Sequence, residues 1–383
     1  MDDEPFFREW SARVPGERRS LARASSLAQA LGLAVGDLHP LVVVGSKGKG
    51  TTATFAAATL RAAGLRVGLI TSPGYRSHRE RVRVDGASLT AAAFAAMASS
   101  LHVALSSLPP RSPGAGYVSP TGAFTLAGLA WLVGQDVDAL VVEAGMGGAS
   151  DESSLTLPSV VAVTPIFEEH LDVLGPDLAS VARDKAGTIN EFTRSVVTAP
   201  QSPEVLPLIE AALTPLIEPA PETGAKPAPV SGAGSSLAAI NAGVGHRAAQ
   251  EYLKVLGHPA APEDLPEVRL PGRQSLHRLG DQTWALDSAI SPPGIDAALS
   301  WCRNPTTVLL SIPDTKDREA CLKALAGHPV VEVRARASHL TFPPGLPALT
   351  DLSDLGDRVL ALGTISFIGE VLDMLDVDME RLF

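Results

Sequence analysis

The sequence has little of what marks secreted, membrane-spanning or nucleic-acid-binding proteins. Its only cysteines, Cys302 and Cys321, have no metal-type spacing, and we expect both to be reduced thiols. No apolar run reaches the roughly 20 residues that are needed to cross a bilayer. The formal net charge of −11 disfavours binding to a nucleic-acid backbone, because such binding depends on many basic side chains. We therefore expect neither a membrane nor a nucleic acid as partner.

The first residues also lack the positive charge of an export signal. Asp2, Asp3 and Glu4 stand where basic residues would precede an apolar segment. Together with the low cysteine content, this predicts a cytoplasmic protein. Aromatic residues make up only 4% of the chain, and alanine, leucine and valine supply most of its apolar side chains. This composition favours helices and parallel strands over an aromatic-rich β protein.

One stretch near residue 45 has the order strand, helix, strand. Leu41 to Val44 is a continuous apolar run, Thr52 to Ala63 has helical composition, and Val67 to Ile70 is a second buried-strand pattern. Two such strands joined by a helix form a βαβ unit, which requires a parallel sheet. The sequence therefore predicts an α/β fold.

Polar residues follow two further predicted strands. Ala139 to Val142 is followed by Glu143 and the glycine-rich turn Gly145 to Gly148, and Val160 to Thr164 repeats the pattern of a strand with a polar end. Ligands of open parallel sheets bind at the carboxyl ends of the strands. We expect the ligand site at that edge.

The 383 residues are too many for one ordinary core and suit two domains. Strand-like runs recur at Thr306–Ser311, Val330–Val333 and Val359–Leu362, separated by helical segments. We predict an N-terminal α/β domain over residues 1–257, a proline- and charge-rich linker over 258–269, and a smaller α/β domain over 270–383. The stretch from Pro200 to Ser236, rich in proline, alanine and serine, reads as a surface excursion.

The loop GSKGKGTT lies between the first predicted strand and its helix, the context of a P-loop. Its glycines allow main-chain N–H groups to surround phosphate oxygens, and the helix N-terminus contributes a positive dipole end. Lys49 would supply a charge to the β- and γ-phosphates. Thr51, with Thr52 as the less favoured alternative, would offer a hydroxyl to Mg²⁺. The predicted nucleotide-binding residues of this loop are Gly45, Ser46, Lys47, Gly48, Lys49, Gly50, Thr51 and Thr52. The alternative is a glycine-rich turn that binds nothing.

These residues resemble the folylpolyglutamate synthase and dihydrofolate synthase branch of the Mur ligase superfamily. The resemblance rests on six segments: VVVGSKGKGTTATFAAATLRAAGLRVGLITSP, RERVRVDG, VVEAGMGG, HLDVLGPDLASVARDKAGTI, PGRQSL and WALDSAISP. It implies a Mur-type P-loop ATPase domain followed by a Rossmann-like C-terminal domain. The implied reaction is amide-bond formation between a small-molecule carboxylate and an amine such as an amino acid. ATP activates the carboxylate as an acyl phosphate, because a free carboxylate has no usable leaving group.

The resemblance also implies roles for individual residues. Thr51 and Glu143, with Ser72 nearby, would hold one Mg²⁺, and His170 would hold a second. Lys185 matches a lysine that is often carbamylated in this superfamily, and Lys49, Glu143, His170 and Lys185 form the expected catalytic set. Three further residues are implied to contact ATP: Asn241, Arg273 and Asp287. Members of the family are commonly monomeric.

The sequence departs from the family pattern at four positions. Gly74, Ala149, Ala238 and Ile290 stand where a histidine, an arginine, a glutamine and a histidine are usual. Each loss removes a hydrogen-bonding group worth on the order of 1–3 kcal/mol when a charge is involved. We interpret the chain as a divergent ligase with altered substrate recognition, and a catalytically degenerate nucleotide-binding or scaffold paralogue is the alternative. A GTPase or simple ATPase would leave the second domain unexplained.

Arg79 to Arg83 has two readings from the sequence. The run could form an exposed charged hairpin, or it could contact an acidic substrate and order a loop over the site.

Overall fold

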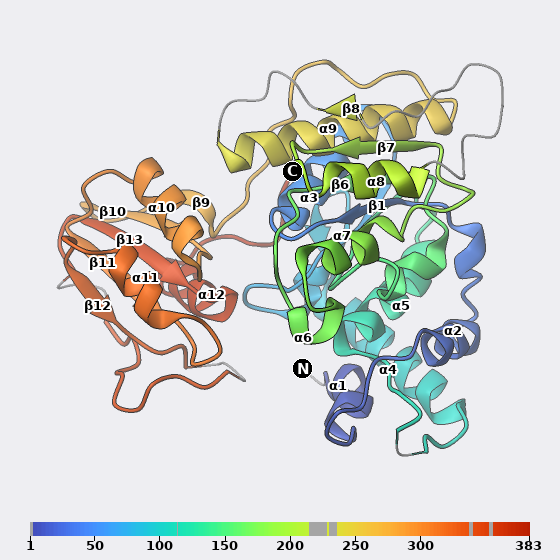
Figure 1. The fold of residues 1–383 in the computed structure, drawn as a ribbon, viewed down its shortest axis with the longest axis horizontal. Coiled ribbons are helices and arrows are strands. Elements are labelled where there is room, and N and C mark those ends of the chain that lie inside the picture. The colour runs from blue at the N-terminus through green and yellow to red at the C-terminus, as the bar shows by residue number, and fades with distance from the viewer. Residues whose placement is uncertain (1–2, 113, 214–227, 230–235, 337–339, 352–354) are drawn as a thin grey trace. The chain divides into compact units, whose positions relative to one another are not determined.

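The structure is a computed structural model that describes residues 3–112, 114–213, 228–229, 236–336, 340–351 and 355–383. Contacts divide the chain into two compact units. The first comprises Met1–Ser72, Arg81–Val268 and Phe383, and the second comprises Pro73–Glu80 and Arg269–Leu382. Both units combine helices with a mainly parallel sheet (Figure 1), which confirms the predicted α/β class.

The first unit is built on an eight-stranded sheet in the order β4-β3-β2-β5-β1-β6-β7-β8. The strands from β2 to β8 in this order pair in parallel, whereas β3 and β4 form an antiparallel edge. Their bounds are β1 Leu41–Val44, β2 Val67–Ile70, β3 Val82–Val84, β4 Ala87–Ser88, β5 Ala139–Glu143, β6 Val160–Val163, β7 Ser195–Thr198 and β8 Ala228–Pro229.

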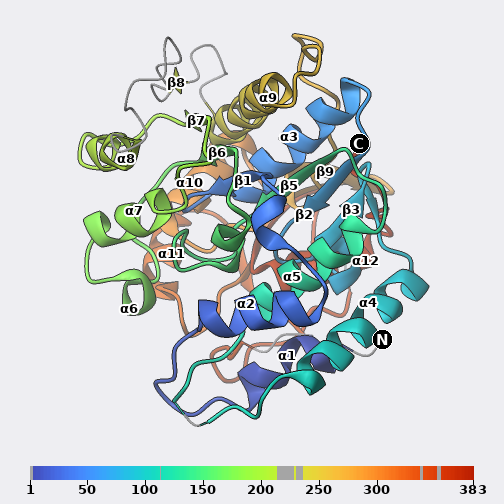
Figure 2. The ribbon, with the colours of Figure 1, turned by 90° about the vertical axis from the view of Figure 1, so that its right-hand side faces the viewer.

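Helices cover both faces of this sheet, as Figure 2 shows. On one face α3 (Lys49–Ala62) packs along α9 (Leu237–Val255). On the other lie α1 Glu4–Ser11, α2 Leu21–Ala30, α4 Ala91–Ser107, α5 Pro120–Val133, α7 Leu178–Ala186 and α8 Leu206–Leu213. Shorter elements are α6 Leu171–Leu174 and the 3₁₀ helices η1 Val35–Asp37, η2 His78–Arg81 and η3 Glu152–Thr156.

The pleat of β1 explains why its residues form a continuous apolar run. Leu41 and Val43 belong to the core with α3 and α9, and Val42 and Val44 belong to the core on the opposite face. Successive side chains of a strand point to opposite faces, so a strand covered on both sides is apolar throughout. The strands predicted near residues 41, 67, 139 and 160 are confirmed within one residue at their ends.

The second unit contains a five-stranded sheet in the order β12-β11-β13-β10-β9. Only β9 is antiparallel to its neighbour. The predicted strands near residues 306, 330 and 359 are confirmed. The elements are β9 Arg273–Leu279, β10 Gln282–Asp287, α10 Pro292–Trp301, β11 Thr307–Ser311, α11 Arg318–Ala324, β12 Val330–Glu332, β13 Arg358–Gly363 and α12 Ile365–Met374.

The segment Pro73–Glu80 follows β2 in sequence but clusters with the second unit. The hydroxyl of Tyr75 donates to the carbonyl oxygen of Gly272 over 3.2 Å. Arg76 and Arg79 form ion pairs at 3.0 Å with Asp373 and Glu380. The sequence limits of 1–257, 258–269 and 270–383 did not anticipate this excursion, and they remain a proposal for the domain boundaries.

None of the described helices is long and apolar enough to span a membrane. The proposed surface excursion from Pro200 to Ser236 includes α8 and β8, but most of its residues lie outside the described part of the chain.

Candidate active site

The loop between β1 and α3 has the backbone of a phosphate-binding turn. Gly45 and Gly48 have φ angles of 136° and 94°, which disfavour any residue with a side chain. A Cβ at Gly45 would lie 2.0 Å from the Thr164 hydroxyl, and one at Gly48 would lie 1.9 Å from the Asn241 amide. Glycine is therefore required at both positions, because a side chain would strain the backbone at these φ angles and would clash with Thr164 or Asn241.

A second loop fixes this turn from the side of β6. The main-chain N–H of Ser46 donates to the carbonyl oxygen of Pro165 over 2.9 Å, and its hydroxyl donates to that of Phe167 over 3.0 Å. The carboxyl ends of β1 and β6, which pair in parallel, are thus tied together at the edge where the sequence predicts ligand binding.

Two lysines meet at the first glycine. Lys49 Nζ and Lys185 Nζ each donate to the carbonyl oxygen of Gly45 over 2.9 Å. Lys185 lies on α7, is fully buried, and also pairs with Glu169 Oε1 at 2.8 Å. Burial, and then repulsion from Lys49, lowers the pKa of the Lys185 amine, and Glu169 opposes this shift. The motif HLDVLG drew attention to His170, but no signal in the sequence identified its neighbour Glu169 as the partner of Lys185.

The two threonines of the loop have different surroundings. Thr52 is fully buried, and its hydroxyl donates to the main-chain oxygen of Asn241 over 3.0 Å. Its main-chain N–H donates to the carbonyl oxygen of Gly48, the N-cap residue of α3. Thr51 is half-buried. The Thr52 hydroxyl is therefore occupied by its bond to Asn241, and a role for Thr51 in holding Mg²⁺ stays a prediction.

Glu143, the last residue of β5, has its carboxylate at the start of α3. Its side chain is buried, and Oε2 accepts a hydrogen bond of 2.8 Å from the main-chain N–H of Ser72. A Cβ at Gly50 would lie 3.3 Å from the same oxygen. The carboxylate, Ser72 and the first turn of α3 are therefore brought together in the first unit.

Arg81 and Arg83 are buried, so the reading of residues 79–83 as an exposed hairpin is wrong for these two. The Arg81 guanidinium lies 4.4 Å from the ring centroid of Phe124. Burial lowers the pKa of Arg81 to about 10, and attraction to Glu143 acts in the opposite direction. A cation is therefore held near the Glu143 carboxylate, a placement that depends on the antiparallel β3 edge.

Asp184, which directly precedes Lys185, holds the glycine-rich turn after Glu143. Its carboxylate accepts hydrogen bonds from the main-chain N–H groups of Gly148 and Ser150, over 2.8 and 3.2 Å. Its carbonyl oxygen accepts another from the N–H of Ala149 over 2.7 Å. Sequence reasoning missed Asp184, since an acidic residue on an amphipathic helix normally faces solvent.

His170 lies after β6, is exposed, and has a left-handed backbone with φ 50°. No group of three or more His, Cys, Asp or Glu side chains suited to a metal ion occurs among the described residues. A magnesium ion bound with nucleotide needs only one or two carboxylates, because phosphate oxygens and water complete its octahedron. The donor chemistry of Glu143 and Thr51 fits such an ion, and a role for His170 stays a prediction.

Asn241 is buried on α9 beneath Gly48, and its Oδ1 has no hydrogen-bond partner among the described residues. This position supports the phosphate loop, and the predicted contact with the nucleotide base remains untested.

In the second unit, Arg273 and Asp287 are paired neighbours at one end of the β9–β10 hairpin. The Arg273 guanidinium is 6.0 Å from the ring centroid of Tyr75. The hairpin thus gathers two of the predicted ATP-contacting residues.

Two departures from the family pattern have local causes. A Cβ at Gly74 would lie 2.3 Å from the carbonyl oxygen of Ser77, so this turn has no room for a side chain. Ile290 packs against the core that contains Ile295 and Leu310. Ala238 lies in the first turn of α9, and nothing in its surroundings explains the change.

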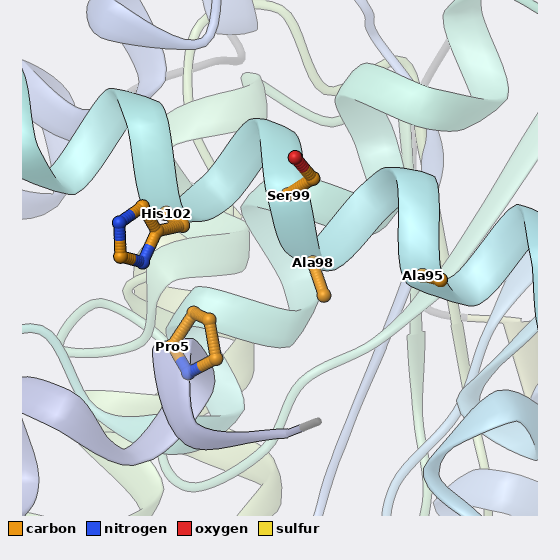
Figure 3. Close-up of a pocket in the computed structure, with 5 residues that line it drawn as sticks. All are labelled: Pro5, Ala95, Ala98, Ser99 and His102. Carbon is orange, nitrogen blue, oxygen red and sulfur yellow. The ribbon is translucent and has the colours of Figure 1, made fainter. Parts of the chain in front are cut away.

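A surface pocket lies between α1 and α4, lined by Pro5, Ala95, Ala98, Ser99 and His102 (Figure 3). It contains none of the residues discussed above and carries no argument about function.

Comparisons with known proteins support the same family. The chain is 33% identical over 187 residues to the Escherichia coli dihydrofolate synthase/folylpolyglutamate synthase, a match that covers 49% of this chain and 42% of that protein. It is 29% identical over 197 residues to the Bacillus subtilis protein of the same name, covering 51% and 45%. The chain thus spans less than half the length of these curated relatives. No family model matches the chain.

Solved structures share the fold over nearly the whole chain. The apo form of the L. casei enzyme matches with a TM-score of 0.80 at 21% identity, covering 98% of this chain and 100% of that one. The Mycobacterium tuberculosis folylpolyglutamate synthase complexed with ADP and AMPPCP gives 0.76 at 22% identity, covering 94% and 96%. Over about half of its length, the chain is thus similar in sequence to folylpolyglutamate synthases and dihydrofolate synthases, and it shares the fold of solved folylpolyglutamate synthases.

Proposed function

We propose that this chain is an ATP-dependent ligase that joins a small-molecule carboxylate to the amine of an amino acid and releases ADP and phosphate. The observation that carries this proposal is the convergence of Lys49, Lys185 and Glu143 on the turn between Gly45 and Gly50. A buried carboxylate and the charge of Lys49 at a helix N-terminus suit a metal-bound triphosphate.

The residues of the loop fit the nucleotide. Glycines at positive φ leave main-chain N–H groups free of steric cover by side chains, and Lys49 places a point charge at the start of α3. Mg²⁺, when bound, would neutralise phosphate charge and align the γ-phosphoryl group with its acceptor. Glu143 and Thr51 would hold this ion with Ser72 nearby, and His170 would serve a second ion on the acceptor side.

Two bonds are exchanged in the proposed reaction. A carboxylate oxygen attacks the γ-phosphorus, the bond to the β–γ bridging oxygen breaks, and ADP leaves. The amine then attacks the acyl carbon, loses a proton, and displaces phosphate. The protein positions the reactants and stabilises developing charge, which can supply much of the rate enhancement. Arg273 and Asp287 would contact the nucleotide, and Asn241 would contact its base.

Lys185 is proposed to act as a carbamate. Its neutral amine would attack CO₂, form an N–C bond and lose a proton, giving an anion that supports the second metal site. The low pKa of the Lys185 amine favours this step, because it raises the neutral fraction. Incubation with ¹³C-bicarbonate should give a carbamate NMR signal that disappears in Lys185→Arg. A spectrum without this signal would assign Lys185 to the ammonium that pairs with Glu169.

The relatives' names point to folate-type carboxylates and glutamate as the first substrates to test. Gly74 and Ala149 motivate the proposal that recognition of the carboxylate substrate has changed. We also propose a monomeric, cytoplasmic enzyme that acts without a nucleic acid or membrane partner.

The activity assay follows ADP formation with pairs drawn from a panel of folates, other carboxylates and amino acids. A ligase forms ADP only when both substrates of a productive pair are present, and mass spectrometry detects the amide product. The alternative, a non-catalytic nucleotide-binding or scaffold paralogue, is favoured by the replacements Gly74, Ala149 and Ile290. It predicts ATP binding by calorimetry without ADP formation for any pair.

A further inference from the structure

The turn that follows Glu143 has no basic residue of its own. Residues 144–151 read AGMGGASD, and the turn ends with Asp151 and Glu152, both buried. Its glycines have no room for side chains: a Cβ at Gly145 would meet Thr121 at 2.2 Å, and one at Gly148 would meet Lys185 at 2.6 Å. Any cation at this turn must therefore come from elsewhere in the chain.

Arg19, from the segment before α2, supplies that cation. Its Nη2 donates to the carbonyl oxygen of Met146 over 3.2 Å and contacts the Ser150 hydroxyl at 3.3 Å. Its Nη1 lies 3.7 Å from Asp151 and 3.9 Å from Glu152. The Arg19 side chain is only 14% exposed, so these interactions are weakly screened by solvent.

The position of Arg19 is itself fixed by main-chain bonding. Residue 19 forms a parallel β-bridge with Tyr117, and the N–H of Ser20 donates to the Tyr117 carbonyl oxygen over 3.0 Å. Across the turn, Glu152 accepts a hydrogen bond of 2.9 Å from Ser119, the N-cap residue of α5. The guanidinium thus joins the N-terminal segment, the turn and the start of α5.

The opposite side of the same turn is held by Asp184, as described above. The turn begins directly after Glu143, and its Gly148 packs against the main chain of Lys185. Both Glu143 and Lys185 are predicted to act in the reaction. Because the turn is fixed between these two groups, a shift of its main chain would move Glu143 relative to Lys185.

We propose that Arg19 is a positioning residue of the ligase, which holds the turn Ala144–Asp151 against Asp184 and so aligns Glu143 with Lys185. This role rests on the function proposed above. Arg19 is not among the residues predicted to bind a substrate, and its proposed role is exerted through the turn.

The test compares Arg19→Ala, Arg19→Gln and Arg19→Lys with Arg18→Ala. Arg18 is exposed and adjacent, so Arg18→Ala makes the same change in net charge without touching the turn. Arg19→Gln keeps the hydrogen-bonding capacity of the side chain without its charge. It replaces Arg19→Ala in the test if Arg19→Ala does not fold. Thermal unfolding of each variant separates a local effect from global loss of structure.

The first readout is hydrogen–deuterium exchange of the peptide covering residues 143–152, measured without ligands. Loss of charge-assisted bonds should speed exchange of the turn amides about tenfold in Arg19→Ala, with partial recovery in Arg19→Lys and none of the effect in Arg18→Ala. Unchanged exchange in Arg19→Ala overturns the proposal, whatever the activity.

The second readout is catalytic. We expect kcat to fall about tenfold or more in Arg19→Ala, because small displacements of reacting groups carry large rate costs. The Mg²⁺ concentration for half-maximal rate should rise, and Arg19→Lys should recover part of both. Faster exchange with unchanged kcat and Mg²⁺ dependence would reduce Arg19 to a structural role and overturn the proposal.

If the wild-type protein forms no ADP with any pair, the proposed ligase function fails. Calorimetric affinity for Mg·ATP then replaces kcat as the second readout. Weaker binding in Arg19→Ala than in Arg18→Ala retains a positioning role for Arg19 at the nucleotide site, and equal binding removes it.

Discussion

Lys49 and Lys185 donate from their Nζ atoms to one and the same acceptor, the carbonyl oxygen of Gly45, each over 2.9 Å. The two side chains come from α3 and from α7, so residues far apart in the sequence meet at the first glycine of the loop. Two cations sharing one carbonyl repel each other, and an anion placed between them would relieve this repulsion. A bound triphosphate, or a carbamate formed on Lys185, would supply such an anion.

The proximity of the two lysines gives a prediction for Lys185. Since burial and Lys49 both lower its pKa, the amine becomes neutral at a lower pH than an ordinary lysine. Lys49→Met removes the nearby charge and should raise the pKa of Lys185. NMR of ¹³Cε-labelled lysine measures the pKa of Lys185 in the wild type and in Lys49→Met. The signal of Lys185 is assigned by its loss in Lys185→Arg. Titration of Lys185 at the ordinary lysine value would contradict the account.

Glu143 is predicted to set the magnesium dependence. Glu143→Gln keeps the size of the side chain but removes the anion beside Gly50. We expect the Mg²⁺ requirement for ADP formation to rise by about 100-fold, at least as much as the loss of an outer-shell partner costs. Glu168→Gln, at an exposed carboxylate, is the matched control. Equal Mg²⁺ dependence in the two variants would exclude Glu143 as a ligand.

Gly48 and Gly64 form a natural pair for testing the phosphate loop. Both have a positive φ, 94° and 99°, but only Gly48 faces a side chain, that of Asn241. Gly64→Ala should cost about 1 kcal/mol from backbone strain. Gly48→Ala adds overpacking of about 1–3 kcal/mol, and it should weaken ATP binding as well. Denaturant unfolding and calorimetry measure the two effects, and identical behaviour of the two variants would mean that Asn241 does not support the loop.

The raised pKa of Glu152 predicts that the stability of the fold depends on pH. Burial, and then repulsion from Asp151, raises the pKa of Glu152 from 4.5 to about 7. The folded state therefore binds this proton more tightly than the unfolded state, and the resulting stability is lost as the pH rises from 4.5 to about 7. Glu152→Gln cannot ionise, so its advantage in unfolding midpoint over the wild type should grow across this interval and stay constant above it. A difference that does not change between pH 4.5 and 8 would contradict this.

The sequence located the strands and the P-loop because each signal there is local. A strand covered on both faces must be apolar throughout, so Leu41–Val44 and Val67–Ile70 were predicted with correct bounds. Glu143 stood out because a carboxylate directly follows such a run. The choice between Thr51 and Thr52 also followed from spacing, and burial of Thr52 against Asn241 is consistent with it.

Other features depend on contacts between segments that are distant in sequence. Asp184 and Arg19 look like ordinary surface charges until the fold places both beside residues 144–151. Arg81 is buried because β3 forms an antiparallel edge next to β2, which no periodic pattern announced. The clustering of Pro73–Glu80 with the second unit likewise rests on side-chain pairs such as Arg79 with Glu380.

The central claim is that the loop around Lys49 binds the triphosphate of ATP together with Mg²⁺. Isothermal titration of the full chain with ATP, with and without Mg²⁺, tests it most directly, with Lys49→Ala and Lys254→Ala compared in parallel. Lys254 is exposed on α9 and provides a charge-matched control. We predict Mg²⁺-dependent binding that is lost in Lys49→Ala and kept in Lys254→Ala. Absence of ATP binding by the wild-type protein, or full binding by Lys49→Ala, would contradict the account.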